Sequence, residues 1–297
     1  MTDLNKYLEH CSQRVEKFFN LHLPEKDQAP TTLHSAIRYS AMSGGKRIRP
    51  ALVYATAEAV QIELTTVDCI AAAIELMHCY SLIHDDLPAM DDDDLRRGKP
   101  TVHCAYDEAT AILAGDAMQA LAFSVLTNSD IPGPNEGTRA RLCFQLSTAV
   151  GSLGMAGGQA MDLAAVNQTI SIDAMEFIHR QKTGCLIKAC IDMSQQCSSK
   201  LSEHQRTSLI QFSEHLGIAF QIRDDILDEI SDTSTLGKPQ GSDRDLNKPT
   251  YVSILGLEES EQRCQQYYQH SLDCLNEFDH HADWLRLLAE HIVCRKN

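Results

Sequence analysis

Several signatures that would assign a chain to a common class are missing from this sequence. No Cys-x-x-Cys pair occurs among its eleven cysteines, so their spacing supports neither a zinc finger nor a redox motif. No Walker-type loop occurs, which excludes a nucleotide P-loop. No apolar run approaches the roughly 18 uninterrupted residues of a membrane span, and the N-terminus lacks the basic-then-apolar pattern of a signal peptide. We therefore expect a cytoplasmic protein without a membrane span.

The cysteines follow the pattern of small apolar residues. Many lie inside apolar, helix-like runs, where a free thiol packs as a small hydrophobe; the clearest examples are Cys69, Cys79, Cys143, Cys185 and Cys190. We expect reduced, buried thiols in a reducing compartment, without disulfides.

Basic residues are also scarce. The chain has 26 Lys and Arg against 41 Asp and Glu, a net charge of −15. This balance argues against nucleic acid as a partner, because such binding relies on clustered Lys and Arg that neutralise phosphates. The basic residues that are present gather in local clusters at 46–49, 96–99, 180–182 and 238–248. Basic islands in an acidic protein indicate a small anionic ligand.

The acidic residues are concentrated in one segment, where residues 85–94 hold six aspartates in ten positions. Like charges this close repel by about 1 kcal/mol per pair even in water, so a cation is expected among them. Mg²⁺ fits, because proteins usually hold it with one or two carboxylates plus substrate phosphates. Arg96, Arg97 and Lys99 follow at once, and arginine binds phosphate through two hydrogen bonds. The alternative is a solvated acidic loop followed by a basic turn.

A second acidic cluster lies far downstream. In a helix, Gln221, Asp224, Asp225 and Asp228 share one face, at offsets of three, four and seven. Carboxylates on one face of an otherwise apolar helix are costly unless they are paired or bind a metal. We predict that the two clusters face each other across a helical bundle and hold a substrate between them through metal ions.

Helical periodicity dominates the rest of the chain. It predicts helices at 4–20, 31–42, 50–62, 66–86, 103–128, 139–150, 172–196 and 202–230, followed by a charged amphipathic remainder. Residues 129–137 read as a loop, and the small-residue segment 151–159 indicates close packing or a break. Since no convincing strand alternation or repeat occurs, we predict one all-α domain over residues 1–297, a bundle of roughly ten or more helices.

A glycine pair at 44–45 precedes Lys46, Arg47 and Arg49 at the start of an expected helix. Backbone amides at a helix N-terminus beside three cations form an anion site. The alternative is an ordinary glycine cap with solvated cations.

Three further polar residues are candidates for ligand contact. His78 lies two helical turns before Asp85 and so shares its face. The pattern favours ligand contact and a core position for this histidine equally. Gln159 and Asp162, at the end of the small-residue segment, are weaker candidates.

Together these motifs resemble the trans-type isoprenyl diphosphate synthases over nearly the whole chain, with the best match to the bacterial-type farnesyl diphosphate synthases. The first aspartate motif, DDxxxxD, is residues 85–91, and the second, DDxxD, is residues 224–228. The GGKRxRP element is residues 44–50, the KT motif is residues 182–183, and Phe-Gln at 220–221 precedes the second motif. Five motifs in the family's order make the resemblance specific.

The resemblance implies an all-α, isoprenoid synthase-like bundle around a central apolar cavity. It implies a Mg²⁺-dependent prenyltransferase that condenses isopentenyl diphosphate head-to-tail with dimethylallyl and then geranyl diphosphate. The reaction would proceed by ionisation, condensation and elimination, with release of diphosphate. The implied cofactor is about three Mg²⁺ ions per active site, with Mn²⁺ as a substitute. The implied partners are isoprenoid diphosphates and a second copy of the chain in a homodimer.

The resemblance also assigns roles to residues. It implies metal binding at Asp85, Asp91, Asp224, Asp86, Asp225 and Asp228. The isopentenyl diphosphate would contact Lys46, Arg49, His78 and Arg97. The allylic diphosphate and its ionising carbon would contact Arg96, Lys182, Thr183, Gln221 and Lys238.

Product length in this family depends on bulky residues four and five positions before the first motif, which here are Ser81 and Tyr80. Tyr80 and the longer spacing of the first motif resemble the enzymes that stop at farnesyl diphosphate. We therefore predict that Tyr80 and Ser81 form the floor of the product cavity.

Several alternatives remain open from the sequence. A geranylgeranyl or geranyl diphosphate synthase would use the same mechanism, and a non-catalytic partner subunit would share the fold. A terpene cyclase shares metal-assisted ionisation but does not need the isopentenyl diphosphate residues. A di-iron bundle is suggested by Glu-x-x-His at 75–78, 176–179 and 277–280, but it has no use for the aspartate motifs.

Overall fold

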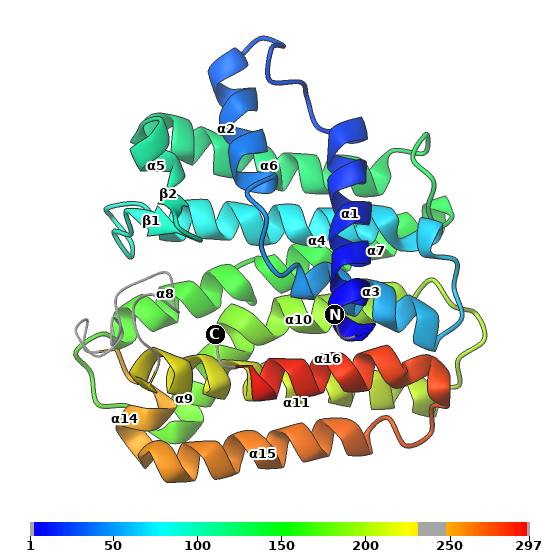
Figure 1. Cartoon of the computed structure of the whole chain (residues 1–297), viewed down its shortest axis with the longest axis vertical. Helices are drawn as coiled ribbons and strands as arrows, with labels where there is room; N and C mark the ends of the chain where they lie inside the picture. The colour runs from blue at the N-terminus through cyan, green and yellow to red at the C-terminus, as the bar shows by residue number, and fades with distance from the viewer. Residues whose placement is uncertain (1–2, 231–247, 296–297) are drawn as a thin grey trace. The chain divides into compact units, whose positions relative to one another are not determined.

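The computed structural model describes residues 3–230 and 248–295, so the predicted diphosphate ligand Lys238 lies outside the described residues (Figure 1). The chain divides into two compact units. The first consists of Met1–Tyr54 with Glu63–Cys143, and the second of Ala55–Ile62 with Phe144–Asn297. Because the chain divides in this way, the single domain over residues 1–297 stays a prediction.

The first unit is built from helices joined by short connections. Its elements are α1 (Asp3–His22), α2 (Thr31–Ala41), the first part of α3 (Ile48–Ala59), α4 (Leu64–Asp85), β1 (Leu95–Arg96), β2 (Lys99–Pro100), α5 (Val102–Ala105), α6 (Glu108–Thr127) and the start of α7 (Glu136–Val150).

Helix α4 forms the core of this unit because it is apolar around almost its whole circumference. Most side chains from Val67 to Ile83 are buried, and α1, α2 and α6 pack against this helix. Both α4 and α6 are long and apolar enough to cross a membrane by length and composition alone. That is weak evidence, because the core helix of a soluble protein passes the same test, and the apolar window of α4 is 72% buried.

A two-stranded antiparallel hairpin follows α4, pairing Leu95 with Pro100 and Arg96 with Lys99. Arg97 and Gly98 form its turn with positive φ angles of 55° and 73°, as a two-residue hairpin turn of the right twist requires. The sequence analysis predicted no strand here. Strands of two residues are too short to show any alternation of apolar and polar side chains.

The second unit is organised around α11 (Glu203–Ile230). Its other elements are α8 (Met155–Ala165), α9 (Ile172–His179), the π-helical turn η1 (Arg180–Gly184), α10 (Cys185–Gln195), α14 (Tyr251–Leu255), α15 (Leu257–Asp273), the short η2 (His280–Ala282) and α16 (Asp283–Cys294). Helices α10, α14, α15 and α16 all pack against α11. Buried core residues from these elements include Met175, Ile218, Ala219, Ile222, Ile226, Tyr251, Cys264 and Val293.

The predicted helix at 103–128 is divided in the structure. Asp107 accepts a hydrogen bond from the Thr110 backbone amide at 2.7 Å and begins α6, while α5 ends at Ala105. The small-residue segment proved to lead into α8, a helix that the sequence pattern did not predict. The expected close packing does occur there, because a Cβ on Gly158 would lie 2.2 Å from the Lys182 backbone nitrogen.

All eleven cysteines are free thiols. Cys69, Cys79 and Cys190 are buried as predicted, whereas Cys143 and Cys185 are only partly buried. Burial raises the pKa of the Cys69 and Cys79 thiols to about 11, so both stay protonated near neutral pH.

Candidate active site

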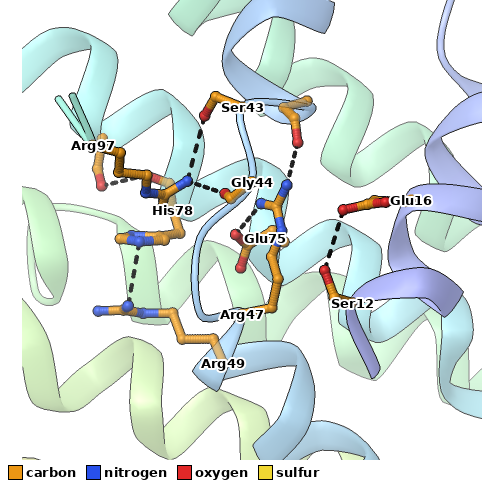
Figure 2. Close-up of polar contacts among 11 residues, drawn as sticks. Ser12, Glu16, Ser43, Gly44, Arg47, Arg49, Glu75, His78 and Arg97 are labelled. Atoms are coloured by element: carbon orange, nitrogen blue, oxygen red, sulfur yellow. Dashed lines mark hydrogen bonds and ion pairs between the residues drawn. The ribbon is translucent and has the colours of Figure 1, made fainter. Parts of the chain in front are cut away.

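The turn between α2 and α3 carries the basic residues of the GGKRxRP element. Gly44 and Gly45 have φ angles of +79° and +116°, and Arg47 also has a positive φ. This path turns the Arg47 side chain inward, where it forms a fully buried ion pair with Glu75 of α4 and donates to the Ala41 carbonyl (Figure 2).

The expectation of three cations facing an anion is therefore wrong for Arg47. Burial opposes the positive charge, but the Glu75 carboxylate more than offsets it, and the pKa of Arg47 lies above its usual value. Arg47 holds the turn against α4 and leaves Lys46 and Arg49 as the basic side chains of this element that could meet a ligand.

Arg49 and Arg97 both lie close to His78 of α4. Arg49 Nη1 is 3.4 Å from His78 Nε2, and Arg97 donates to the Gly44 carbonyl and to Ser43 Oγ. In Figure 2 the His78 ring lies between the two arginine side chains. Burial, and then the charges of Arg49 and Arg97, hold the pKa of His78 well below its usual range. His78 is therefore a neutral imidazole beside two cations.

These contacts gather three of the four predicted isopentenyl diphosphate residues in one place. The fourth, Lys46, is exposed on the same turn as Arg49. Positive charge and hydrogen-bond donors of this kind suit a multiply charged anion such as a diphosphate.

The first aspartate motif begins where α4 ends. The Asp91 backbone amide donates to the Asp85 carbonyl at 2.8 Å, which brings Asp91 back beside the helix end. Asp86 is 3% exposed and accepts from Arg96 Nε at 2.7 Å, and Arg96 also contacts Asp93 at 2.8 Å. Burial outweighs the arginine and raises the pKa of Asp86. The partly exposed Asp85 and Asp91 are therefore better placed to bind a metal than Asp86.

The second motif lies on α11, as predicted. Gln221 donates to Asp225 Oδ1 at 2.9 Å, and the Tyr251 backbone amide donates to Asp225 Oδ2 at 2.8 Å. Asp225 and Asp228 are buried, at 4% and 5% exposure. Asp224 differs, because its half-exposed carboxylate forms an ion pair with Arg295, which also covers the Phe220 ring.

A cleft of about 680 Å³ opens beside this motif within the second unit. Its charged lining residues are Asp225, Asp228, Glu229 and Lys248. Residues 167–170, 249–250 and 252–254 form the remaining wall. Acidic oxygens and a lysine around one open space are the groups that a metal-bound diphosphate requires.

The KT motif lies in the π-helical turn η1, a geometry frequent at functional sites. Lys182 Nζ donates to Asp162 Oδ2 at 2.6 Å, and Thr183 Oγ1 donates to Gln221 Oε1 at 2.9 Å. Burial would raise the pKa of Asp162, but Lys182 lowers it below its usual value. Through Lys182 the turn contacts Asp162, one of the weaker candidates, and through Thr183 it contacts Gln221 beside the second aspartate motif.

Gln159 is the second weak candidate from the small-residue segment. Both polar atoms of its side chain are buried and lack a hydrogen-bond partner among the described residues. A buried amide without a partner costs about 1–3 kcal/mol. It is therefore a group that a ligand could satisfy.

Sequence reasoning missed two residues that shape these contacts. Glu75 had a signal, because it is the one acidic residue inside the apolar run 69–83. Arg295 had none, since it lies 71 positions from the Asp224 that it contacts and nothing in the local pattern connects them.

The carboxylates present fit Mg²⁺, which prefers oxygen ligands and keeps several waters. Asp85 and Asp91 are partly exposed, and Asp225 and Asp228 border the open cleft. Neither motif offers a thiol or imidazole that would favour a softer metal.

Comparisons with known proteins match the chain over its length. A sequence profile of the polyprenyl synthetase family matches residues 30–284. Farnesyl diphosphate synthase of Escherichia coli is 43% identical over 296 residues, covering 99% of both chains. Farnesyl diphosphate synthase of Haemophilus influenzae is 43% identical over 300 residues, covering 100% of both.

Solved structures match as well. A geranyltransferase from Legionella pneumophila has a TM-score of 0.89 and 37% identity over 99% of this chain and 97% of its own. An FPP/GFPP synthase from Zymomonas mobilis has a TM-score of 0.88 and 37% identity, over 98% and 99%. These similarities confirm the predicted all-α, isoprenoid synthase-like fold.

Proposed function

The chain belongs to the polyprenyl synthetase family, and on this premise we propose that it is a Mg²⁺-dependent farnesyl diphosphate synthase. It would condense isopentenyl diphosphate with dimethylallyl diphosphate and then with geranyl diphosphate, and release diphosphate at each step. The observation that carries the proposal is the full-length similarity, at 43% identity, to two bacterial enzymes of that name.

The aspartate motifs would hold the metal. Asp85, Asp91 and Asp224 are the proposed ligands, and Asp86, Asp225 and Asp228 would act as further ligands or supports. Bound Mg²⁺ would stabilise the negative charge that grows on the leaving diphosphate. The ion pair of Asp224 with Arg295 would have to open or rearrange for Asp224 to act as a ligand.

Basic side chains would bind the allylic diphosphate together with the metal. Arg96 and Lys182 are the described candidates, each already positioned by a carboxylate, Asp86 and Asp162 respectively. Lys238 is a further candidate, and Lys248 lines the cleft beside the second motif. Such preorganised cations stabilise charge that develops in the transition state.

Thr183 and Gln221, which are joined by a hydrogen bond, would face the allylic carbon that becomes positively charged. The Thr183 hydroxyl donates a hydrogen bond to Gln221 Oε1, so the lone pairs of the threonine oxygen stay available to face the cation. Oxygen atoms held in this way can stabilise a carbocation without attacking it.

The isopentenyl diphosphate would bind the cluster of Lys46, Arg49, His78 and Arg97. If the neutral His78 ring accepts a hydrogen bond from Arg49 at Nε2, its N–H lies at Nδ1. That N–H can donate a hydrogen bond to a phosphate oxygen. The double bond then attacks the allylic cation, and the proton lost afterwards can pass to the released diphosphate, so no protein nucleophile is required.

Tyr80 and Ser81 would set the product length. Tyr80 is 8% exposed and lies edge-on to the His84 ring, with the centroids 5.7 Å apart. Ser81 is held by a 2.9 Å hydrogen bond to the His78 carbonyl. A longer product is the second candidate function, favoured by the similarity to the FPP/GFPP synthase of Zymomonas mobilis.

We also propose that the chain forms a homodimer through α6. Only 39% of the apolar window of α6 is buried, and Ile112 and Leu113 are 44% and 56% exposed. A second copy would cover this face. We expect the enzyme in the cytoplasm, where its free thiols would stay reduced.

The test is a product assay with Mg²⁺, isopentenyl diphosphate and either dimethylallyl or geranyl diphosphate. We expect farnesyl diphosphate from both allylic substrates, and no product with a chelator. Asp85→Asn should also abolish the product, while Asp130→Asn, at an exposed loop aspartate, should not. Geranylgeranyl diphosphate as the main product would support the second candidate. No condensation by the folded protein would refute both candidates.

A further inference from the structure

A cluster of potential metal ligands lies at the base of the β1–β2 hairpin. Asp94 directly precedes β1, and His103 and Cys104 lie on α5 just after β2. One ligand atom from each residue lies within 4.8 Å of the other two. None of the three is used by the proposed condensation chemistry.

The cysteine sulfur lies near the other two ligand atoms, at separations close to those between two ligands of one zinc ion. Cys104 Sγ lies 3.3 Å from Asp94 Oδ1 and 3.4 Å from His103 Nε2. In a tetrahedral zinc site with usual Zn–S and Zn–N bond lengths, the sulfur and nitrogen atoms are about 3.5 Å apart. Thiolate, imidazole and carboxylate are also the three ligand types that zinc uses in proteins.

Neighbouring residues orient these ligands. His103 Nδ1 is 3.1 Å from Thr101 Oγ1, which directs Nε2 toward Cys104. Metal-binding histidines in proteins usually have such a partner on the second ring nitrogen. The Thr101 backbone amide also donates to the Asp94 carbonyl at 3.0 Å, so the chain before the hairpin is fixed to the chain after it.

We propose that Asp94, His103 and Cys104 bind one Zn²⁺ ion, with water as the fourth ligand. The Cys104 thiol gives up its proton to solvent as the zinc–sulfur bond forms. A fourth position open to water agrees with the exposure of Asp94 and Cys104. The site contains a single cysteine, so no search for Cys-x-x-Cys spacing would find it.

Zinc binding would close residues 94–104 into a ring. This ring contains the whole hairpin, including Arg96 and Arg97. Because the ion crosslinks both ends, hydrogen exchange at the hairpin amides should slow when zinc is bound, whether or not the chain is a prenyltransferase.

The experiment is a Co²⁺ titration of the full chain, with excess Mg²⁺ present to occupy sites made only of oxygen ligands. A thiolate bound to Co²⁺ gives a near-ultraviolet charge-transfer band. We expect this band to saturate at one Co²⁺ per chain and to disappear when Zn²⁺ is added. Cys104→Ser should lose the band, and Thr101→Val should weaken Zn²⁺ binding by about tenfold or more.

Two controls separate this site from others. Cys294→Ser removes another exposed cysteine and should leave the band unchanged. The group of Asp279, His280 and His281 is a second possible ligand set, but it contains no sulfur and so cannot produce the band. The proposal fails if no thiolate band forms, or if the band persists in Cys104→Ser.

Discussion

Arg49 Nη1 and His78 Nε2 lie 3.4 Å apart although they belong to different helices, α3 and α4. Two positive groups this close would repel, so the contact depends on a neutral imidazole. The low pKa of His78 keeps its ring neutral, and this allows Arg49 to lie against the ring and be presented to an anion.

Arg49→Met should raise the KM for isopentenyl diphosphate by about 10- to 100-fold, the effect of losing one or two charge-assisted hydrogen bonds. The KM for geranyl diphosphate should change little. Steady-state kinetics with each substrate varied in turn would measure both. The control is Arg141→Met, at an exposed arginine of α7. Equal increases in both KM values would contradict the assignment of Arg49 to the isopentenyl site.

Glu75→Gln should destabilise the protein by about 3–5 kcal/mol, because it leaves the buried Arg47 charge without its partner. Urea unfolding would measure this change. Glu261→Gln removes a comparable pair with Arg223 in which the carboxylate is half-exposed, and it should cost less than about 1 kcal/mol. Equally small losses of unfolding free energy for the two variants would contradict this prediction, because Arg47 would then have found another partner or reached solvent.

Tyr80→Ala should shift the product from farnesyl toward longer diphosphates, because it removes a bulky ring from the proposed cavity floor. Tyr80→Phe keeps the ring and should keep the product. Chromatography of dephosphorylated products would show both. An unchanged product distribution for the alanine variant would disprove the floor assignment.

Gly158→Ala should destabilise the protein by about 1–3 kcal/mol, the usual cost of overpacking. The added methyl would lie 2.2 Å from the Lys182 backbone nitrogen, which cannot move without displacing η1. Gly137→Ala is the matched control, because its methyl would meet only ordinary contacts at 3.5 Å and beyond. Thermal unfolding should show a lower Tm for the first variant alone.

His179 should make stability depend on pH. Burial lowers its pKa to about 4 from the usual 6.5, so between these values only the unfolded chain binds the proton. Stability from this residue is therefore present above pH 6.5 and is lost as the pH falls toward 4, by about 1.4 kcal/mol per pH unit. His179→Gln should flatten the unfolding profile in this window, whereas His10→Gln, at an exposed histidine, should not. The same pH dependence of unfolding in the unsubstituted protein, His179→Gln and His10→Gln would contradict the lowered pKa of His179.

The sequence was sufficient where a pattern is repeated over many residues. The core helix α4 and the location of the second aspartate motif on α11 follow from helical periodicity and were confirmed. The inward turn of Arg47 could not be predicted, because a positive φ at a non-glycine residue has no sequence signature. The Asp224–Arg295 pair could not be predicted either, since it depends on tertiary packing of α16 beside α11.

The π-helical turn η1 lies within an uninterrupted helical run from Ile172 to Gln195. Such a turn accommodates one residue more than an α-helical turn. Deleting one residue there would convert the turn into ordinary α-helix, and α9 and α10 would keep their present faces because the wide turn already absorbs the extra residue. The cost would fall on the turn itself, because the deletion would displace Lys182 and Thr183 from Asp162 and Gln221. The wide turn therefore lets one short segment carry both contacts without altering the packing faces of the helices on either side.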